Sequence, residues 1–214
     1  MSAQLGQLLR TERLSLLELL EGLPAEEWAV PSLCAGWTVH DVAAHLAWAP
    51  VVGVSESALG LVRAGLRMNR FIADSAVRWS GRGRDAILTQ LRDNARTGVA
   101  PMGMPRESAL TDAIVHALDV RLPVGRPRAV PPEAFVPAAD WLLGLRWPMT
   151  MTTGGSTRHR VAGVRLVAGA ADWSHGTGPE AHGSTAALML LLTGRPVSPG
   201  ELTGPGADRL LPRP

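Results

Sequence analysis

Lysine and tyrosine are absent from this chain, phenylalanine occurs only twice, and cysteine occurs once, at Cys34. A single cysteine excludes a disulfide bond within the chain. The scarcity of phenylalanine and tyrosine leaves few rings on which nucleic-acid bases could stack. All 21 basic residues are arginines, and the 19 acidic residues reduce the net charge to +2. The composition therefore argues against a nucleic-acid partner.

Long apolar segments are also missing, because no run reaches the roughly 18 residues that a transmembrane helix needs. The N-terminal segment lacks the basic region and the apolar run of a signal peptide. We therefore expect a cytoplasmic protein with no membrane partner. A hydrophobic fraction of 46% is typical of a globular fold, and 214 residues allow one large domain or one domain with a small appendage.

Helical spacing of apolar residues dominates the first two thirds of the chain. Leucines follow this spacing within residues 4–22. Thr38, with Asp41 three residues later, is a plausible N-cap of a second helix from about residue 39, which breaks at Pro50 and resumes to about residue 72. Further helices are expected at 84–97, 106–121 and about 132–146.

The character of the sequence changes after Pro148. The Thr- and Gly-rich segment 149–160 is typical of a linker, and the β-branched residues of 161–168 predict a strand. A second short strand is expected from residue 172, and Ser184 is expected to cap a helix that runs to about residue 192. We therefore predict a mainly α fold class, with a helical bundle in residues 1–148 and a small α/β domain in residues 158–214.

Two segments, residues 37–46 and 112–121, place polar groups on helix faces that are otherwise apolar. Positions four apart on a helix point in nearly the same direction, so Asp112 and His116 can bind one ion. His40 and His45 are five apart, so both cannot bind that ion. We select His45, because it lies among apolar positions whereas His40 lies in the first turn of its helix. The candidate metal ligands are therefore His45, Asp112 and His116.

Two imidazoles and one carboxylate suit Zn²⁺, with Ni²⁺, Fe²⁺ and Mn²⁺ as alternatives. Three protein ligands leave part of the coordination sphere open, which is typical of catalytic rather than structural zinc. Asp119 lies three residues after His116, where its carboxylate can orient the imidazole. Taken alone, a helical Asp-x-x-x-His pattern is common, and a lone histidine in a helix is more often a hydrogen-bonded core residue.

The two segments together resemble a known family. The segment PSLCAGWTVHDVAAHL, residues 31–46, is similar to a signature of the mycothiol-dependent maleylpyruvate isomerase family of actinobacteria, which belongs to the DinB-like metal-binding four-helix bundles. Residues 114–127 resemble its second signature, and residues 166–180 resemble its small C-terminal domain. The resemblance covers most of the chain and is specific to the superfamily rather than to one reaction. It implies an up-down four-helix bundle followed by a small α/β domain.

The resemblance also implies a metal triad, which by matching position falls on His45, Asp112 and His116. It further implies mycothiol as a thiol cosubstrate, whose metal-bound thiolate attacks a small electrophile. The isomerases proper have Glu where this chain has Asp112, and the shorter side chain changes the reach of that ligand. The prediction is a metal-dependent thiol transferase or isomerase, acting as a monomer or homodimer on a small-molecule electrophile.

Several weaker candidates complete the predicted site. Arg106 and Arg121 are candidate anion contacts. Asp172, Trp173 and His175 are candidates to line a ligand cleft.

Two sequence features have a plain and a functional interpretation. Cys34 precedes a helix, where a thiol pKa can be lowered, but a small buried residue is the plainer interpretation. Arginines also form a loose basic stretch, for which a solvated helix face is the plainer interpretation and an anionic ligand or surface is the alternative. These are Arg63, Arg67, Arg70, Arg78, Arg82 and Arg84.

Two other classes of function stay open. One is a non-catalytic metal- or ligand-binding module of the same fold, in which the polar trio is vestigial. The other is a nucleic-acid-associated stress protein, which only the arginine content suggests.

Overall fold

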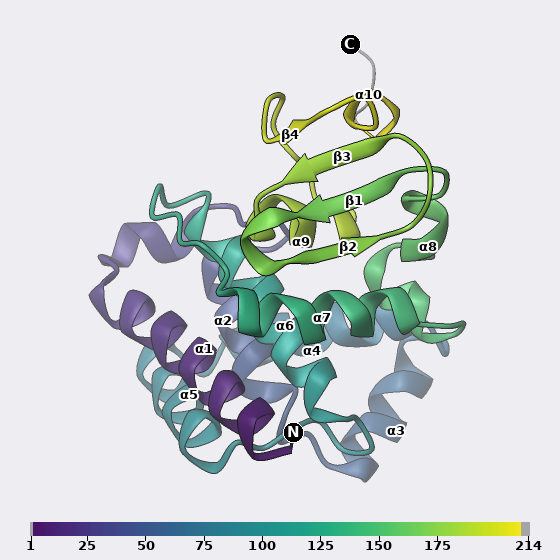
Figure 1. Cartoon of the computed structure of the whole chain (residues 1–214). Coiled ribbons are helices and arrows are strands. Elements are labelled where there is room, and N and C mark those ends of the chain that lie inside the picture. Colours follow the sequence, from purple (N-terminus) through teal and green to yellow (C-terminus); the bar gives the residue numbers. More distant parts are fainter. Residues whose placement is uncertain (1, 211–214) are drawn as a thin grey trace. The chain divides into compact units, whose positions relative to one another are not determined.

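The structure is a computed structural model that describes residues 2–210 (Figure 1). The chain divides after Pro127 into two compact units. The first is helical and the second combines helices with a small sheet, which confirms the mainly α fold class. Within the described residues, no helix combines the length and the apolar character that a bilayer span requires.

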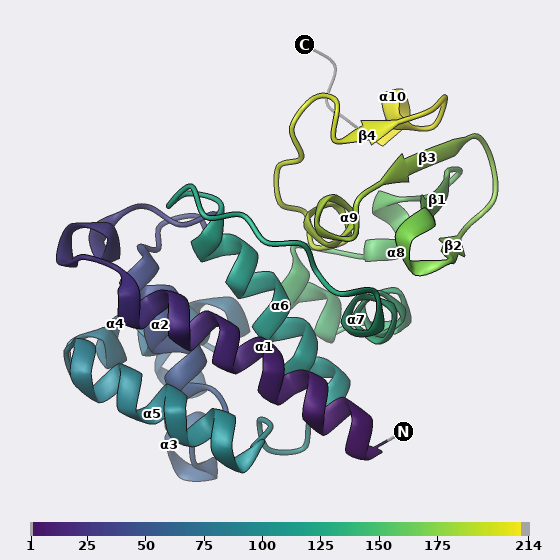
Figure 2. The same cartoon turned by 60° about the vertical axis from the view of Figure 1, so that its left-hand side comes forward.

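The first unit contains a four-helix bundle. Its helices are α1 (Ser2–Gly22), α2 (Val39–Trp48), α3 (Val54–Arg63), α4 (Met68–Ser80), α5 (Arg84–Thr97) and α6 (Arg106–Arg121), and the 3-10 helix η1 (Ala25–Ala29) follows α1. α1 packs against α5 and α6, and α2 packs against the same two helices (Figure 2). α4 lies against α2 outside this group of four, and α3 packs against α4.

The segment predicted as a helix from residue 39 to about 72 is three helices. The expected break near Pro50 is present, and α3 begins only after Gly53. A second break separates α3 from α4, where Gly65 and Leu66 have φ angles of +65° and +59°. A left-handed pair of residues cannot continue a right-handed helix, so the chain turns at this point.

The start of α2 is fixed by its first residues. The Thr38 hydroxyl oxygen accepts a hydrogen bond from the Asp41 backbone N–H at 3.3 Å. The Asp41 carboxylate in turn accepts from the Thr38 backbone N–H at 2.9 Å. This reciprocal capping box satisfies two donors that a helix start otherwise leaves unpaired. The predicted N-cap at Thr38 is therefore present.

The bundle interior is mostly apolar, and several polar side chains connect its helices. Asn94 of α5 is buried, and its amide donates to the carbonyl oxygens of Leu46 and Ala47 at 3.2 and 2.9 Å. Arg121 at the end of α6 donates to the backbone and hydroxyl oxygens of Ser15 at 2.7 and 2.9 Å. These contacts fix the ends of α2 and α6 against their neighbours.

The second unit contains a four-stranded sheet of order β2-β1-β3-β4, in which β1 and β3 are parallel and the other pairs antiparallel. The strands are β1 (Arg165–Ala168), β2 (Trp173–His175), β3 (Glu180–Gly183) and β4 (Leu202–Thr203). The helices are α7 (Pro132–Gly144), α8 (Thr157–Arg160), α9 (Thr185–Leu192) and α10 (Ala207–Leu210), with 3-10 helices η2 (Met149–Thr153) and η3 (Gly169–Ala171). α9 is almost wholly buried and contacts β1, β3 and α7.

The division after Pro127 differs from the domain limits expected from the sequence. By its contacts α7 is part of the second unit, because it packs against α8, α9 and η3. Phe135 of α7 meets the ring of Trp173 edge-on, with centroids 5.2 Å apart. The segment 149–160, expected as a linker, contains η2 and α8. Helical spacing shows that a helix has an apolar face, but it does not show which unit covers that face. For this reason the helix expected at about 132–146 was predicted to belong to the bundle.

Candidate metal centre

The loop between η1 and α2 is closed by its own hydrogen bonds. The backbone N–H and the hydroxyl of Ser32 both donate to the Trp37 carbonyl oxygen at 2.9 Å. The Cys34 backbone N–H donates to the Ser32 hydroxyl oxygen at 3.1 Å. The Leu33 backbone N–H donates to the carbonyl oxygen of Asp119 at 3.2 Å, which ties the loop to α6. The loop therefore holds Cys34 and Trp37 beside α6.

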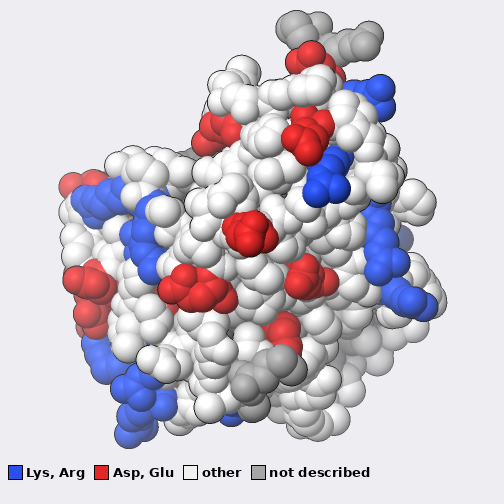
Figure 3. All heavy atoms as spheres, viewed as in Figure 1, with Lys and Arg blue, Asp and Glu red and all other residues white. Residues whose placement is uncertain are grey.

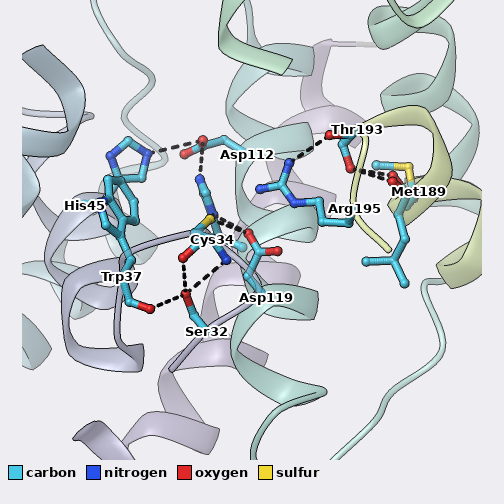
Figure 4. A network of polar contacts seen from close by, with 11 residues as sticks. Ser32, Cys34, Trp37, His45, Asp112, Asp119, Met189, Thr193 and Arg195 are labelled. Carbon is cyan, nitrogen blue, oxygen red and sulfur yellow. Dashed lines mark hydrogen bonds and ion pairs between the residues drawn. The ribbon is translucent and has the colours of Figure 1, made fainter. Parts of the chain in front are cut away.

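Three side chains from two helices converge beside this loop (Figure 4). Nε2 of His45 on α2 and Nε2 of His116 on α6 each lie 3.4 Å from Oδ1 of Asp112, also on α6. The two imidazole side chains are 8% and 12% exposed, whereas the Asp112 side chain is 33% exposed. Solvent therefore reaches the trio mainly at the carboxylate.

The spacing of these atoms suits ligands of one metal ion. Two ligand atoms bound at about 2.05 Å to a tetrahedral ion are about 3.3 Å apart, whereas a tight charge-assisted hydrogen bond is about 2.7–2.9 Å. The observed separations of 3.4 Å match the first value. Two imidazole nitrogens and a carboxylate oxygen also form a donor set that Zn²⁺ and neighbouring divalent metals accept. The residues present therefore fit the metal that the sequence predicted.

His116 is also held at its other ring nitrogen. Nδ1 lies 2.8 Å from Oδ2 of Asp119, a fully buried carboxylate. The Cys34 thiol donates to the same oxygen at 3.0 Å, and its sulfur lies 3.6 Å from Nδ1 of His116. A carboxylate at Nδ1 favours a proton on that nitrogen and leaves the lone pair of Nε2 for a metal. Asp119 thus lies where it can orient His116.

Charge and hydrogen bonding set the proton affinities in the trio. Burial alone would raise the pKa of the Asp112 carboxyl, but the charges and hydrogen bonds of His45 and His116 outweigh burial and hold that pKa well below its usual range. Burial would lower the pKa of His116, yet the charge of Asp112, together with hydrogen bonds of the imidazole with Asp112, Asp119 and Cys34, raises that pKa well above its usual range. Without a metal, the proton on His116 neutralises Asp112, and a divalent cation can replace that proton.

An aromatic side chain covers both imidazoles. The Trp37 ring lies 5.3 Å from the His45 ring and 6.3 Å from the His116 ring, measured between centroids, and is nearly parallel to the second. The two imidazoles meet each other edge-on at 4.9 Å. His40 is directed elsewhere and meets Trp28 edge-on at 5.4 Å. The structure thus brings His45, and not His40, to Asp112.

The two arginines predicted as anion contacts have other neighbours. Arg121 donates to Ser15 and holds α6 to α1. Arg106 is exposed at the start of α6, with its guanidinium beside Gly6 of α1. Neither contact places an arginine at the trio.

The predicted cleft residues of the second unit are partly structural. Trp173 is buried, and its indole N–H donates to the Asp140 carboxylate at 3.1 Å. The His175 ring stacks on Trp173 at 6.2 Å, and Asp172 ends η3 with a left-handed φ of +47°. Their predicted role in lining a cleft stays a prediction.

Three residues near the trio were not among the site residues predicted from the sequence. The plainer interpretation of Cys34 was a small buried residue. Cys34 is instead half-buried, and its thiol donates a hydrogen bond to the Asp119 carboxylate. Trp37 was noted only as part of a motif. Arg13 of α1 donates to the Asn94 carbonyl oxygen at 2.9 Å, and burial lowers its pKa while the charge of Asp112 raises it. Cys34 and Trp37 lie in a loop, where no periodicity predicts direction, and Arg13 carried no sequence signal.

The chain is similar to known proteins of one family. The family model of the mycothiol maleylpyruvate isomerase N-terminal domain matches residues 9–161. Two solved structures of the mycothiol-dependent maleylpyruvate isomerase, one with a histidine-to-alanine substitution, are similar to the chain, each with a TM-score of 0.62 and 14% identity. Each match covers 96% of this chain and 93% of the other, and at this identity it shows a shared fold. No curated protein sequence matches the chain.

Proposed function

Because the chain belongs to the mycothiol maleylpyruvate isomerase family, we propose that it is a metal-dependent enzyme that uses a low-molecular-weight thiol. The thiol is mycothiol or a close equivalent, and the enzyme isomerises or S-conjugates a small electrophile. The observation that carries this proposal is the trio of His45, Asp112 and His116, whose ligand atoms lie within 4.8 Å of one another.

Each residue of the site has a role in this proposal. His45, Asp112 and His116 hold a divalent metal, with Zn²⁺ as the first candidate and Ni²⁺, Fe²⁺ or Mn²⁺ as alternatives. The bound metal supplies Lewis acidity, which lowers the pKa of a thiol and polarises a carbonyl group. Asp119 keeps the Nδ1 proton of His116 and so directs Nε2 toward the metal position. Trp37 lies against both imidazoles and limits the approach of water from its side.

Asp112 is the ligand that departs from the family pattern. Its carboxylate is shorter by one methylene than glutamate, yet Oδ1 already lies 3.4 Å from both imidazole nitrogens. This supports metal binding by the shorter side chain. It also supports approach of the thiol and the electrophile past Asp112, because this ligand is the most exposed of the three.

Metal analysis tests the site directly. The protein is purified without a histidine tag, and bound metal is measured by mass spectrometry before and after chelation and reloading with Zn²⁺, Ni²⁺, Fe²⁺ or Mn²⁺. We expect about one metal per chain, lost in His116→Ala. His40→Ala is the matched control, because His40 lies against Trp28, away from the trio. Absence of affinity for every divalent metal would overturn the site.

The reaction needs a separate assay. The metal-loaded protein is incubated with mycothiol and a panel of electrophiles, and thiol consumption and product isomers are followed. We expect turnover by wild-type protein that is abolished in His116→Ala and retained in His40→Ala. Metal binding without turnover of any electrophile would favour the second candidate function.

That second candidate is a non-catalytic metal- or ligand-binding module. It is favoured by one observation, namely that Nε2 of His116 lies 3.4 Å from Oδ1 of Asp112, where the two side chains can form an ion pair with each other. A cytoplasmic location and a monomeric or homodimeric state stay predictions in either case.

A further inference from the structure

The first unit has a cleft of about 600 Å³ beside the metal centre. This volume lies within the roughly 300–1,000 Å³ range of sites that bind small molecules. The loop before α2 forms one side, and α3 and α4 form the rest. Its walls include the rings of Trp37 and Phe71 and the side chain of Val77. Most of the lining is therefore apolar.

The aromatic wall depends on a glycine. A Cβ atom at Gly60 would lie 2.3 Å from Cε2 of Phe71, so only glycine lets this ring rest on the α3 backbone. The Phe71 ring then meets Trp48 of α2 edge-on, with centroids 5.4 Å apart. The wall is thus fixed by packing and does not depend on a ligand.

Two guanidinium groups face this apolar surface. Arg63 of α3 and Arg78 of α4 line the cleft together with one acidic residue, Asp74. Arg78 is oriented by a hydrogen bond of 2.7 Å to the hydroxyl of Ser75, which is itself buried. Asp74 lies 3.6 Å from Arg70, which offsets its charge. The cleft is therefore positively charged.

Arg63 adds to this charge a set of hydrogen-bond donors that are available to a ligand. Within residues 2–210 its guanidinium has neither a hydrogen bond nor an ion pair. A guanidinium presents parallel N–H groups that match the two oxygens of a carboxylate. Two such groups beside an apolar wall form the combination that recognises an organic anion rather than an inorganic one.

The cleft and the metal centre share one side chain. Trp37 lines the cleft and also contacts the rings of His45 and His116. A molecule in the cleft therefore contacts the same indole that covers two of the three candidate metal ligands. Both sites lie in the first unit.

We propose that this cleft is a binding site for a small organic carboxylate with a flat apolar body. Arg63 and Arg78 contact the carboxylate, and Trp37, Phe71 and Val77 pack against the body. The proposal goes beyond the proposed function, because neither arginine belongs to the candidate metal trio. It also gives Arg63 and Arg78 the contact with an anionic ligand that was the alternative interpretation of the basic stretch.

The test uses the full chain after metal removal with a chelator, so that the metal centre cannot bind the probe. Cinnamate is titrated by calorimetry and by tryptophan fluorescence, with cinnamamide as the neutral match and inorganic phosphate as the small anion. We expect saturable binding of cinnamate that changes the fluorescence, and about tenfold weaker binding of both other probes.

Variants assign the site to the two arginines. Arg63→Gln and Arg78→Gln are each expected to weaken cinnamate binding about tenfold, since a hydrogen bond to a charged group is lost. Arg10→Gln is the matched control, because Arg10 is exposed on α1. In Trp37→Phe the calorimetric binding stays within a few fold, while the fluorescence change is largely lost. Circular dichroism melts confirm that each variant is folded.

Three results would overturn the proposal. They are the absence of saturable cinnamate binding, equal affinity for cinnamamide or phosphate, and unchanged affinity in both arginine variants. None of these results bears on the metal site, because the protein is metal-free throughout. Conversely, a chain that binds no metal can still show the expected cinnamate binding.

Discussion

His116 is held on both sides of its ring, and this double contact is the central feature at the scale of single residues. Nε2 faces Asp112 at 3.4 Å, and Nδ1 lies 2.8 Å from Asp119. Asp119 also accepts a hydrogen bond from the Cys34 thiol at 3.0 Å, so a loop residue supports the helix residue that orients a candidate metal ligand. Such outer partners fix the tautomer and the direction of a ligating histidine.

Replacing Asp119 with Asn is therefore expected to weaken metal binding without removing a ligand. The amide keeps the size of the side chain but accepts the Nδ1 proton less strongly, so Nε2 becomes a poorer donor. We expect a loss of about 10- to 100-fold in Zn²⁺ affinity, measured by competition with a chromophoric chelator. Asp93→Asn, which changes an aspartate paired with Arg96 on α5, serves as control. An unchanged affinity in Asp119→Asn would rule out this supporting role.

At the scale of elements, α6 supplies most of the candidate site. Asp112, His116 and Asp119 lie on one face of this helix because they are spaced by four and three residues. Their positions follow from the sequence once α6 is recognised. The remaining candidate ligand comes from α2, where His45 is buried with its Nε2 3.4 Å from Asp112 of that face.

The capping box of α2 is expected to stabilise the unit that contains the site. Thr38→Ala removes the hydroxyl that accepts from Asp41, which costs about 1 kcal/mol of unfolding free energy. Thermal unfolding by circular dichroism should show a midpoint lower by a few degrees, and Thr38→Ser should restore it. Thr97→Ala provides the comparison, because Thr97 is an exposed residue at the end of α5. Equal midpoints for the alanine variants at 38 and 97 would argue against the cap.

At the scale of the whole molecule, charges of both signs share the face that Figure 3 draws. The face in Figure 3 carries arginines and acidic side chains next to one another. A net charge of +2 over 214 residues agrees with this mixture. A strong attraction to nucleic acid requires a basic stripe or patch, and this face has none among the residues described.

The stability of the metal-free protein is expected to depend on pH through the trio. The pKa of His116 is raised in the folded state, so its stabilising charge is fully present below the unfolded value of about 6.5 and is lost as the pH rises through the folded value. The pKa of Asp112 is lowered, so its contribution is present above about 3.9 and is lost as the pH falls. The thermal midpoint of chelator-treated protein should therefore fall on the alkaline side, above pH 6.5.

A variant and a metal separate this effect from general alkaline destabilisation. His116→Gln should lose most of the extra decline between pH 7 and 9. Added Zn²⁺ should reverse the trend, because metal and proton compete for His116 and metal affinity rises with pH. Parallel pH profiles for the wild type and His116→Gln would show that the trio does not control this dependence.

Much of the fold follows from local pattern. The helices at 84–97 and 106–121 agree with the structure, because each has a periodic apolar face and a clear stop at its end. The break between α3 and α4 was not predicted, because the left-handed turn at Gly65 and Leu66 has no sequence signal as strong as proline. The sheet was predicted only in part, because β3 contains no β-branched residue and β4 has only two residues.

The sequence by itself determined the fold class and the family and made His45, Asp112 and His116 the candidate metal ligands, because helix geometry and signature motifs are local properties of the chain. Only the tertiary structure decided that the Cys34 thiol reaches Asp119, and that Trp37 covers the imidazoles while lining a cleft. It also decided that α7 packs with the second unit. The physical reason is the same in each case: a loop side chain has no periodic direction, and an apolar helix face does not specify its partner.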